Sequence, residues 1–130
     1  MVREVVNSEI LLDNIINSIQ EVKADDVCTI DLRNIDNNFC SYFVICNGTS
    51  NVHVNSIVGS IQKKISKKLR EKPFNTEGES NGEWVLIDYV DIIVHVFQKK
   101  MREYYNLEEL WGDASIKKIS SKINNEKIKK

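Results

Sequence analysis

The sequence is poor in the residues that mark disulfide-bonded, metal-binding and membrane proteins. Its 130 residues include three cysteines, none in a CxxC pair, and two histidines, so we expect no metal and no cofactor. Cys28 and Cys46 fall within predicted strands, where a buried, inert thiol is expected. No apolar run approaches the ~20 residues of a membrane-spanning helix, and the first residues lack the apolar core of a signal peptide. We therefore expect a cytoplasmic protein with no membrane partner.

The remaining composition is typical of one folded domain, with 42% hydrophobic and 28% charged residues. The net charge of −1 conceals two regions of opposite sign. Residues 77–113 contain nine acidic and three basic residues, which suits a basic partner. Basic residues gather on one predicted helix and after residue 113, where solvation is the simplest explanation. They are Lys63, Lys64, Lys67, Lys68, Arg70, Lys72, Lys117, Lys118, Lys122, Lys127, Lys129 and Lys130.

Hydrophobic periodicity predicts an α/β fold. Apolar residues recur every three or four positions after Ser8, a candidate N-cap, and again between Val54 and Leu69, ahead of Pro73. Both segments are expected to be helices. The nearly all-apolar run 42–46 is expected to be a central strand covered on both faces. Further strands are predicted at residues 27–32, 74–77, 84–88 and 92–97, with a short helix near residue 107.

These elements imply a single domain with a mixed, mostly five-stranded β-sheet and flanking helices. The strands 84–88 and 92–97 must be antiparallel because their connection is short. We assign the folded domain to residues 1–114. Residues 115–130 are predicted to be a lysine-rich tail that is weakly ordered or helical, since Ile116, Ile119 and Ile123 have helical spacing.

No group of residues has a clear catalytic role. Gly48, Thr49 and Ser50 separate a strand from a helix, where backbone N–H groups favour phosphate, and they resemble the turn that opens nucleotidyltransferase domains. That chemistry needs acidic residues to hold magnesium, and residues 51–62 contain neither Asp nor Glu. His53 and His95 are candidate bases, but a mid-strand position favours a half-buried structural imidazole for His95. We expect a protein that is not an enzyme, with a minimal nucleotidyltransferase as the less favoured alternative.

The hairpin at residues 82–97 combines large apolar side chains with negative charge. Trp84 and Tyr89 stand beside three carboxylates, Glu83, Asp88 and Asp91. Trp and Tyr are frequent anchors of protein interfaces, and surrounding charges orient a partner. The alternative is that these rings complete the core.

Five ordered blocks carry the most specific signal in the chain, because they follow one another at a fixed spacing between residues ~8 and 114. The blocks are Ala-Asp-Asp at 24–26 with Asp-Leu-Arg at 31–33, Tyr-Phe-Val-Ile-Cys-Asn-Gly-Thr-Ser at 42–50, Gly-Glu-Trp-Val-Leu-Ile-Asp-Tyr at 82–89, His-Val-Phe at 95–97, and Arg-Glu-Tyr-Tyr at 102–105 with Leu-Glu-Glu-Leu-Trp-Gly-Asp-Ala at 107–114. Together they resemble the ribosomal silencing factor family, also called Iojap-like.

The resemblance implies a mixed α/β domain related to the nucleotidyltransferase fold but without its catalysis. It implies binding to large-subunit ribosomal protein fourteen, on the face of the large ribosomal subunit that meets the small subunit. Bound there, the protein would block subunit joining sterically and damp translation when nutrients are scarce. The family also forms homodimers off the ribosome. Its binding surface maps onto the hairpin, at Trp84, Leu86, Asp88, Tyr89 and Asp91.

The basic segments leave a second interpretation open, an RNA-binding accessory factor in large-subunit biogenesis. Lysines on the helix and in the tail would add nonspecific, salt-sensitive attraction to ribosomal RNA. No aromatic residue is interleaved with these lysines, and no recognised nucleic-acid motif is present. We therefore expect at most a peripheral contact with ribosomal RNA.

Overall fold

Helices and strands both occur in residues 7–35 and 40–119, the part of the chain that the computed structural model describes. No helix among these residues is long and apolar enough to cross a membrane. In chain order the elements are α1 (Ser8–Glu21), β1 (Asp25–Asp31), β2 (Tyr42–Gly48), α2 (Asn51–Leu69), β3 (Asn75–Glu77), β4 (Trp84–Asp88), β5 (Ile92–Gln98), α3 (Lys99–Tyr105), α4 (Leu107–Leu110) and β6 (Ser115–Lys118).

The strands form one mixed sheet in the order β3-β4-β5-β2-β1-β6. β2 and β5 pair in parallel, and every other neighbouring pair is antiparallel. β2 is buried along its whole length, as predicted for a central strand. The predicted α/β class and mixed sheet are confirmed.

The sheet has six strands and not five, because the predicted tail contributes β6. Ile116 pairs with Ile30 of β1, and Lys118 pairs with Cys28. So short a segment cannot sustain a helix by itself, whereas the edge of β1 offers unpaired backbone groups to a further strand. For residues 115–118 the prediction of a weakly ordered or helical tail is therefore wrong. Residues 120–130 lie outside the described part of the chain.

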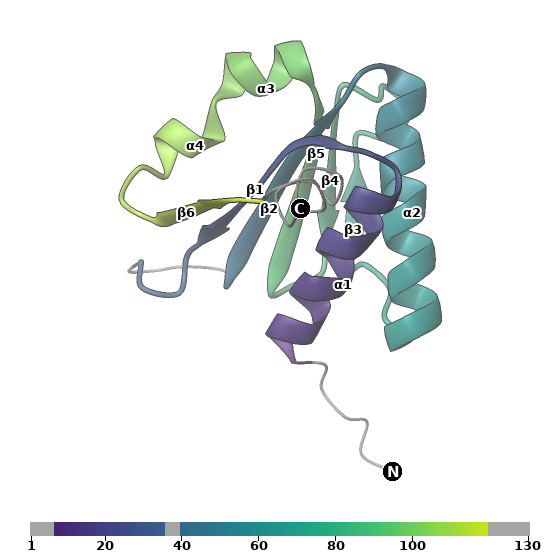
Figure 1. The fold of residues 1–130 in the computed structure, drawn as a ribbon, viewed down its shortest axis with the longest axis horizontal. Coiled ribbons are helices and arrows are strands. Elements are labelled where there is room, and N and C mark those ends of the chain that lie inside the picture. The colour runs from purple at the N-terminus through teal and green to yellow at the C-terminus, as the bar shows by residue number, and fades with distance from the viewer. Residues whose placement is uncertain (1–6, 36–39, 120–130) are drawn as a thin grey trace, which may run out of the picture.

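Helices cover both faces of the sheet (Figure 1). α1 and α2 pack side by side on one face, and α3 and α4 lie over the other. The core beneath α1 and α2 includes Ile15, Ile19, Val44, Ile57, Ile61, Ile87 and Val94. The core beneath α3 and α4 includes Ile30, Phe43, Ile45, Phe97, Met101, Leu107 and Trp111.

The start of α1 differs by one residue from its prediction. Asn7, and not Ser8, is the N-cap, because its side-chain oxygen accepts the backbone N–H of Glu9 at 2.7 Å. The Ser8 hydroxyl donates instead to the carboxylate of Asp91, which fastens α1 to the β4–β5 turn. α2 ends ahead of Pro73, as predicted.

The β4–β5 connection is a strained turn. Val90 has a φ of 73°, in the left-handed region that β-branched residues avoid. The N–H of Asp91 donates to the carbonyl of Tyr89 at 2.9 Å, which is the bond of a γ-turn. The Asp88 carboxylate accepts the N–H of Val90 at 2.7 Å, and the Asp91 carboxylate accepts the hydroxyl of Ser41 at 2.7 Å. These bonds hold a conformation that costs ~1–3 kcal/mol.

Val90→Gly is expected to raise the free energy of unfolding by ~1 kcal/mol. The substitution removes the steric strain of the Cβ in the folded state, and this gain exceeds the loss from the greater conformational entropy of glycine in the unfolded chain. Val90 is 64% exposed, so little burial is lost. The control is Val52→Gly: Val52 is 79% exposed in α2, where glycine disfavours the helix and should lower stability. Urea unfolding checks both signs, and a destabilised Val90→Gly variant contradicts the assignment of strain.

Candidate functional site

Trp84 is the centre of an aromatic cluster on the face of the sheet that α3 covers. Its ring stacks on Phe97 with centroids 5.0 Å apart and contacts the ring of Tyr105 at 4.6 Å. Its indole N–H donates to Nδ1 of His95 at 3.1 Å. The residue is half-buried, so the packed part of the ring fixes its orientation while the rest is accessible to a partner.

His95 is buried beneath this cluster, with 4% of its surface exposed. Because Nδ1 accepts from Trp84, the neutral ring carries its proton on Nε2, which has no hydrogen-bond partner among the described residues. Phe43 meets the imidazole edge-on at 4.6 Å. Burial lowers the pKa of His95 to about 4, so the ring is uncharged at neutral pH. The interpretation of His95 as a structural imidazole is confirmed, and the burial is deeper than predicted.

The five predicted partner-binding residues fall into two groups. Trp84, Leu86 and Asp88 alternate with buried residues along β4 and share its half-buried face. Tyr89 is packed into the core beneath α1 and α2, where burial raises the pKa of its hydroxyl. Asp91 accepts hydrogen bonds from two serine hydroxyls and holds the turn. Only the first three are therefore brought together on one surface.

Two tyrosines of α3 extend that surface. Tyr104 is 80% exposed, and its ring meets Tyr105 edge-on with centroids 5.1 Å apart. Tyr105 in turn contacts Trp84. The predicted partner-binding site left out both tyrosines because no helix was predicted at residues 99–105. The sequence feature that could have identified them is the aromatic pair itself, which lies within the acidic segment 77–113. We define the aromatic surface as Trp84, Leu86, Asp88, Tyr104 and Tyr105.

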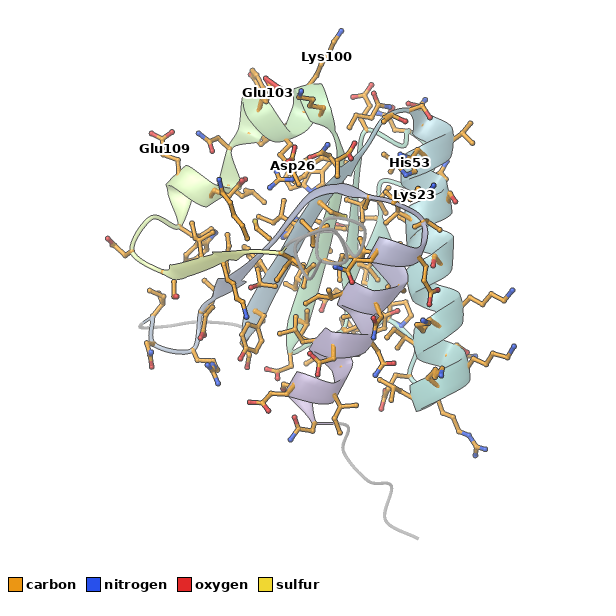
Figure 2. The ribbon with its side chains drawn as sticks, in the orientation of Figure 1. Lys23, Asp26, His53, Lys100, Glu103 and Glu109 are labelled. Carbon is orange, nitrogen blue, oxygen red and sulfur yellow. The ribbon has the colours of Figure 1, made fainter. Side chains whose placement is uncertain are left out.

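Acidic side chains lie on the elements that carry or adjoin the aromatic surface. Glu103 and Glu109 are exposed and point outward from α3 and α4, although α3 also carries the exposed Lys99 and Lys100 (Figure 2). Glu77 of β3 pairs with Leu86 across the antiparallel ladder, which places both side chains on the same face of the sheet. Exposed aromatic rings with carboxylates near them can complement a basic partner surface.

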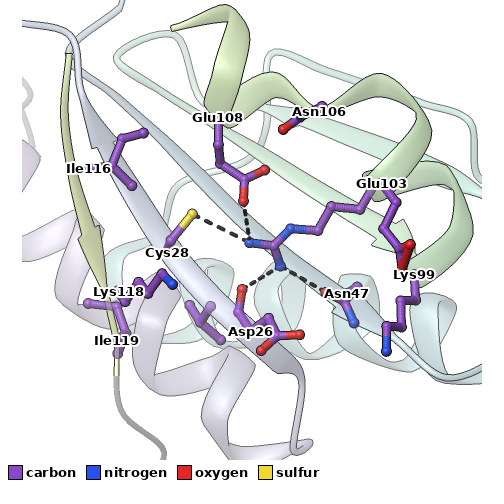
Figure 3. A pocket seen from close by; sticks show the side chains of 12 residues that line it. Asp26, Cys28, Asn47, Lys99, Glu103, Asn106, Glu108, Ile116, Lys118 and Ile119 are labelled. Carbon is purple, nitrogen blue, oxygen red and sulfur yellow. Dashed lines mark hydrogen bonds and ion pairs between the residues drawn. The ribbon is translucent and has the colours of Figure 1, made fainter. Parts of the chain in front are cut away.

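A pocket of about 700 Å³ opens between α3, α4 and the β1–β6 edge (Figure 3). Arg102 crosses it, donating to the backbone carbonyl of Asp26, to the Asn47 side chain at 2.8 Å and to the Glu108 carboxylate at 3.0 Å. The guanidinium also lies 3.6 Å from the Cys28 sulfur, and burial raises the pKa of that thiol. Three basic and three acidic residues line the pocket. Arg102 therefore fastens α3 and α4 to the sheet, and no excess charge favours one class of ligand.

Two backbone amides of the turn after β2 are bonded within the chain. The N–H of Thr49 donates to Nδ1 of His53 at 2.9 Å, and Nε2 of His53 donates to the carbonyl of Val22 at 2.8 Å. The hydroxyl of Ser50 accepts the N–H of His53 at 3.1 Å. Within residues 7–35 and 40–119, no group of three or more His, Cys, Asp or Glu side chains could hold a metal ion. The turn serves as the start of α2 and gives no support to nucleotidyl transfer.

Comparison with known proteins places this geometry in a family. The family model described as "Ribosomal silencing factor during starvation" matches residues 6–130. The chain belongs to the ribosomal silencing factor family. A relative from Halalkalibacterium halodurans, "Ribosomal silencing factor RsfS", is 34% identical over 119 residues, which cover 92% of this chain and 100% of the relative.

Two further proteins resemble this chain, one in structure and one in sequence. A crystal structure of a Chromobacterium violaceum protein superposes with a TM-score of 0.77 and 29% identity, covering 82% of this chain and 88% of that one. A mouse protein named "Mitochondrial assembly of ribosomal large subunit protein 1" is 29% identical over 102 residues, 77% of this chain and 44% of its own length. The family match extends beyond residue 114, so it includes β6, which the sequence-based resemblance left out.

The buried His95 predicts a pH dependence of stability. Its pKa is lowered in the folded protein from 6.5 to about 4, so the unfolded chain binds this proton first as the pH falls. Stability is therefore fully present above pH ~6.5 and is lost toward pH ~4, by about 3 kcal/mol at 1.36 kcal/mol per pKa unit. Denaturant unfolding of the wild type and of His95→Gln at several pH values checks this. The difference in unfolding free energy between the wild type and His95→Gln should shrink as the pH falls. If the stability of both proteins depends on pH in the same way, the assignment to His95 is wrong.

Proposed function

We propose that the protein binds the large ribosomal subunit through the aromatic surface and prevents the small subunit from joining. The observation that carries the proposal is the exposed pair Tyr104 and Tyr105, in which Tyr105 contacts the half-buried, oriented ring of Trp84. A rigid aromatic anchor within a carboxylate rim is typical of an interface, because the rings supply binding energy and the charges steer the encounter. Family membership supports a ribosomal partner.

The partner within the subunit is large-subunit ribosomal protein fourteen. In this proposal Trp84, Leu86 and Asp88 contact it, while Tyr89 and Asp91 act indirectly by fixing the turn that follows Asp88. The acidic rim requires a basic surface on the partner. The mechanism is steric occlusion and needs no catalysis, in agreement with the internally bonded turn at residues 48–50. Ribosome binding also fits a cytoplasmic location.

A homodimer off the ribosome is part of the same proposal. The aromatic surface exposes two tyrosines that a second copy of the chain would cover. A dimer through this surface would compete with the ribosomal partner, so dilution should favour ribosome binding. Sedimentation of the free protein over a range of concentrations measures the dimer directly.

A second candidate function is assistance in large-subunit assembly, which the name of the mouse relative favours. Such a factor would bind precursor subunits through the same surface. Cells that lack the protein distinguish the two roles. Accumulation of incomplete large subunits favours assembly, whereas normal subunits with unrestrained joining favour silencing.

Tyr104→Ala is expected to weaken binding to purified large subunits by roughly thirtyfold, corresponding to the ~2 kcal/mol of a lost interface anchor. Folding should be preserved because Tyr104 is 80% exposed. Asp88→Lys should act in the same direction, because it opposes the basic partner and removes the carboxylate that holds the β4–β5 turn. The readouts are cosedimentation with large subunits and inhibition of 70S formation in a subunit-joining assay.

The matched controls lie away from the aromatic surface. Val52→Ala removes an apolar side chain of α2 that is 79% exposed, and Asp13→Lys reverses an exposed acid of α1. Both should bind like the wild type. Subunit joining that is unchanged at saturating wild-type protein rejects the function, and wild-type binding by Tyr104→Ala and Asp88→Lys rejects the site.

A further inference from the structure

A second surface lies on the other side of the sheet, where the end of α1 meets the middle of α2. A groove of about 440 Å³ runs between them. Glu21 and Val22 form its α1 wall, and its α2 wall consists of Ser56, Gly59, Ser60, Lys63, Lys64, Lys67 and Lys68. The helices are fastened together along it, because the hydroxyl of Ser60 donates to the carbonyl of Ser18 at 3.0 Å. The groove is therefore a fixed feature of the fold.

The groove is strongly basic. Lys64 is paired with Glu21 and its side chain is only 19% exposed, so it supports the wall. Lys63, Lys67 and Lys68 are exposed and, in the part of the chain that the structure describes, make no ion pair. Lys63 and Lys67 are four residues apart, about 6 Å along the helix, and so follow one edge of the groove. Nitrogen-tipped side chains project from the outer side of α2 into solvent (Figure 2).

The floor of the groove is open and polar. Gly59 lies in the interior of α2, where glycine costs ~1 kcal/mol relative to alanine. No packing requires it, because an added Cβ would meet nothing within 4 Å. Ser56 supplies a hydroxyl group beside it, whereas the hydroxyl proton of Ser60 is used in the bond to Ser18. A ligand that approached the helix here would meet small side chains followed, in the next two turns of α2, by the lysines.

We propose that this groove, here called the lysine groove, binds the phosphodiester backbone of RNA. Positive charge, a hydroxyl donor and an open floor match phosphate and sugar groups. Aromatic residues are absent from the lining, so bases cannot stack there and the contact is independent of sequence. An acidic protein segment is the competing ligand that the test must exclude.

The lysine groove is independent of the aromatic surface, because the two lie on opposite faces of the sheet. The protein therefore has the aromatic surface with its carboxylates on one side of the sheet and the basic lysine groove on the other. On a ribosome, the first would dock on a basic protein while the second engages nearby RNA and fixes the orientation. RNA binding by the free protein tests the groove without any assumption about the aromatic surface.

The experiment measures anisotropy of a labelled RNA duplex titrated with the full-length protein between 50 and 200 mM salt. Three phosphate contacts give a slope of log K against log salt near −2.7, so wild-type affinity should fall about fortyfold over this range. The triple variant Lys63→Gln, Lys67→Gln, Lys68→Gln keeps good helix formers and should lose binding at low salt together with most of the slope. Thermal unfolding verifies its fold.

The control removes the same charge elsewhere, by Lys99→Gln, Lys100→Gln and Lys117→Gln, three exposed lysines outside the lysine groove. It should bind RNA like the wild type, as should Tyr104→Ala. Equal losses in both triple variants, or no loss in the groove variant, overturn the proposal. So does displacement of RNA by polyglutamate at matched charge, which would identify an acidic protein as the ligand. Loss of subunit-joining inhibition in Tyr104→Ala with RNA binding intact separates the two functions.

Discussion

The parallel pairing of β2 with β5 is the interaction on which the rest of the structure depends. It joins Tyr42 to Ile92 and continues residue by residue to Gly48 and Gln98. The two strands are almost wholly buried, and a parallel pair of this kind must be covered on both faces. α1 and α2 therefore occupy one face, and the chain that leaves β5 turns to the other face as α3. Every surface discussed above follows from this division.

The division also separates charge. α2 carries four lysines and no acidic residue, whereas residues 99–113, which include α3 and α4, carry four acidic and three basic residues. Arg102 fastens α3 to Asn47 and α4, which positions Tyr105 beside Trp84 and Tyr104 beside Tyr105. A small domain thus offers two chemically different surfaces without a second core.

Two features that lower stability lie next to the proposed interface. His95 is buried, and its Nε2 has no partner in the described part of the chain, while Val90 holds a strained conformation at the end of β4. A buried group without a hydrogen-bond partner, or a strained backbone conformation, persists only where the surrounding contacts are favourable enough to hold it in place. Here the indole of Trp84 and the carboxylates of Asp88 and Asp91 supply those contacts. The same residues therefore stabilise the hairpin and shape the surface that it presents.

The sequence by itself determined the two long helices, the central strand and the hairpin, because hydrophobic periodicity and turn chemistry are local properties. It also placed Trp84, Leu86 and Asp88 on one face, since alternation along a strand is fixed by geometry. Only the tertiary structure decided that Tyr89 turns into the core, because one strained residue after it reverses the chain. It also decided that residues 115–118 form β6, since an edge strand forms by pairing with β1, far away in the sequence.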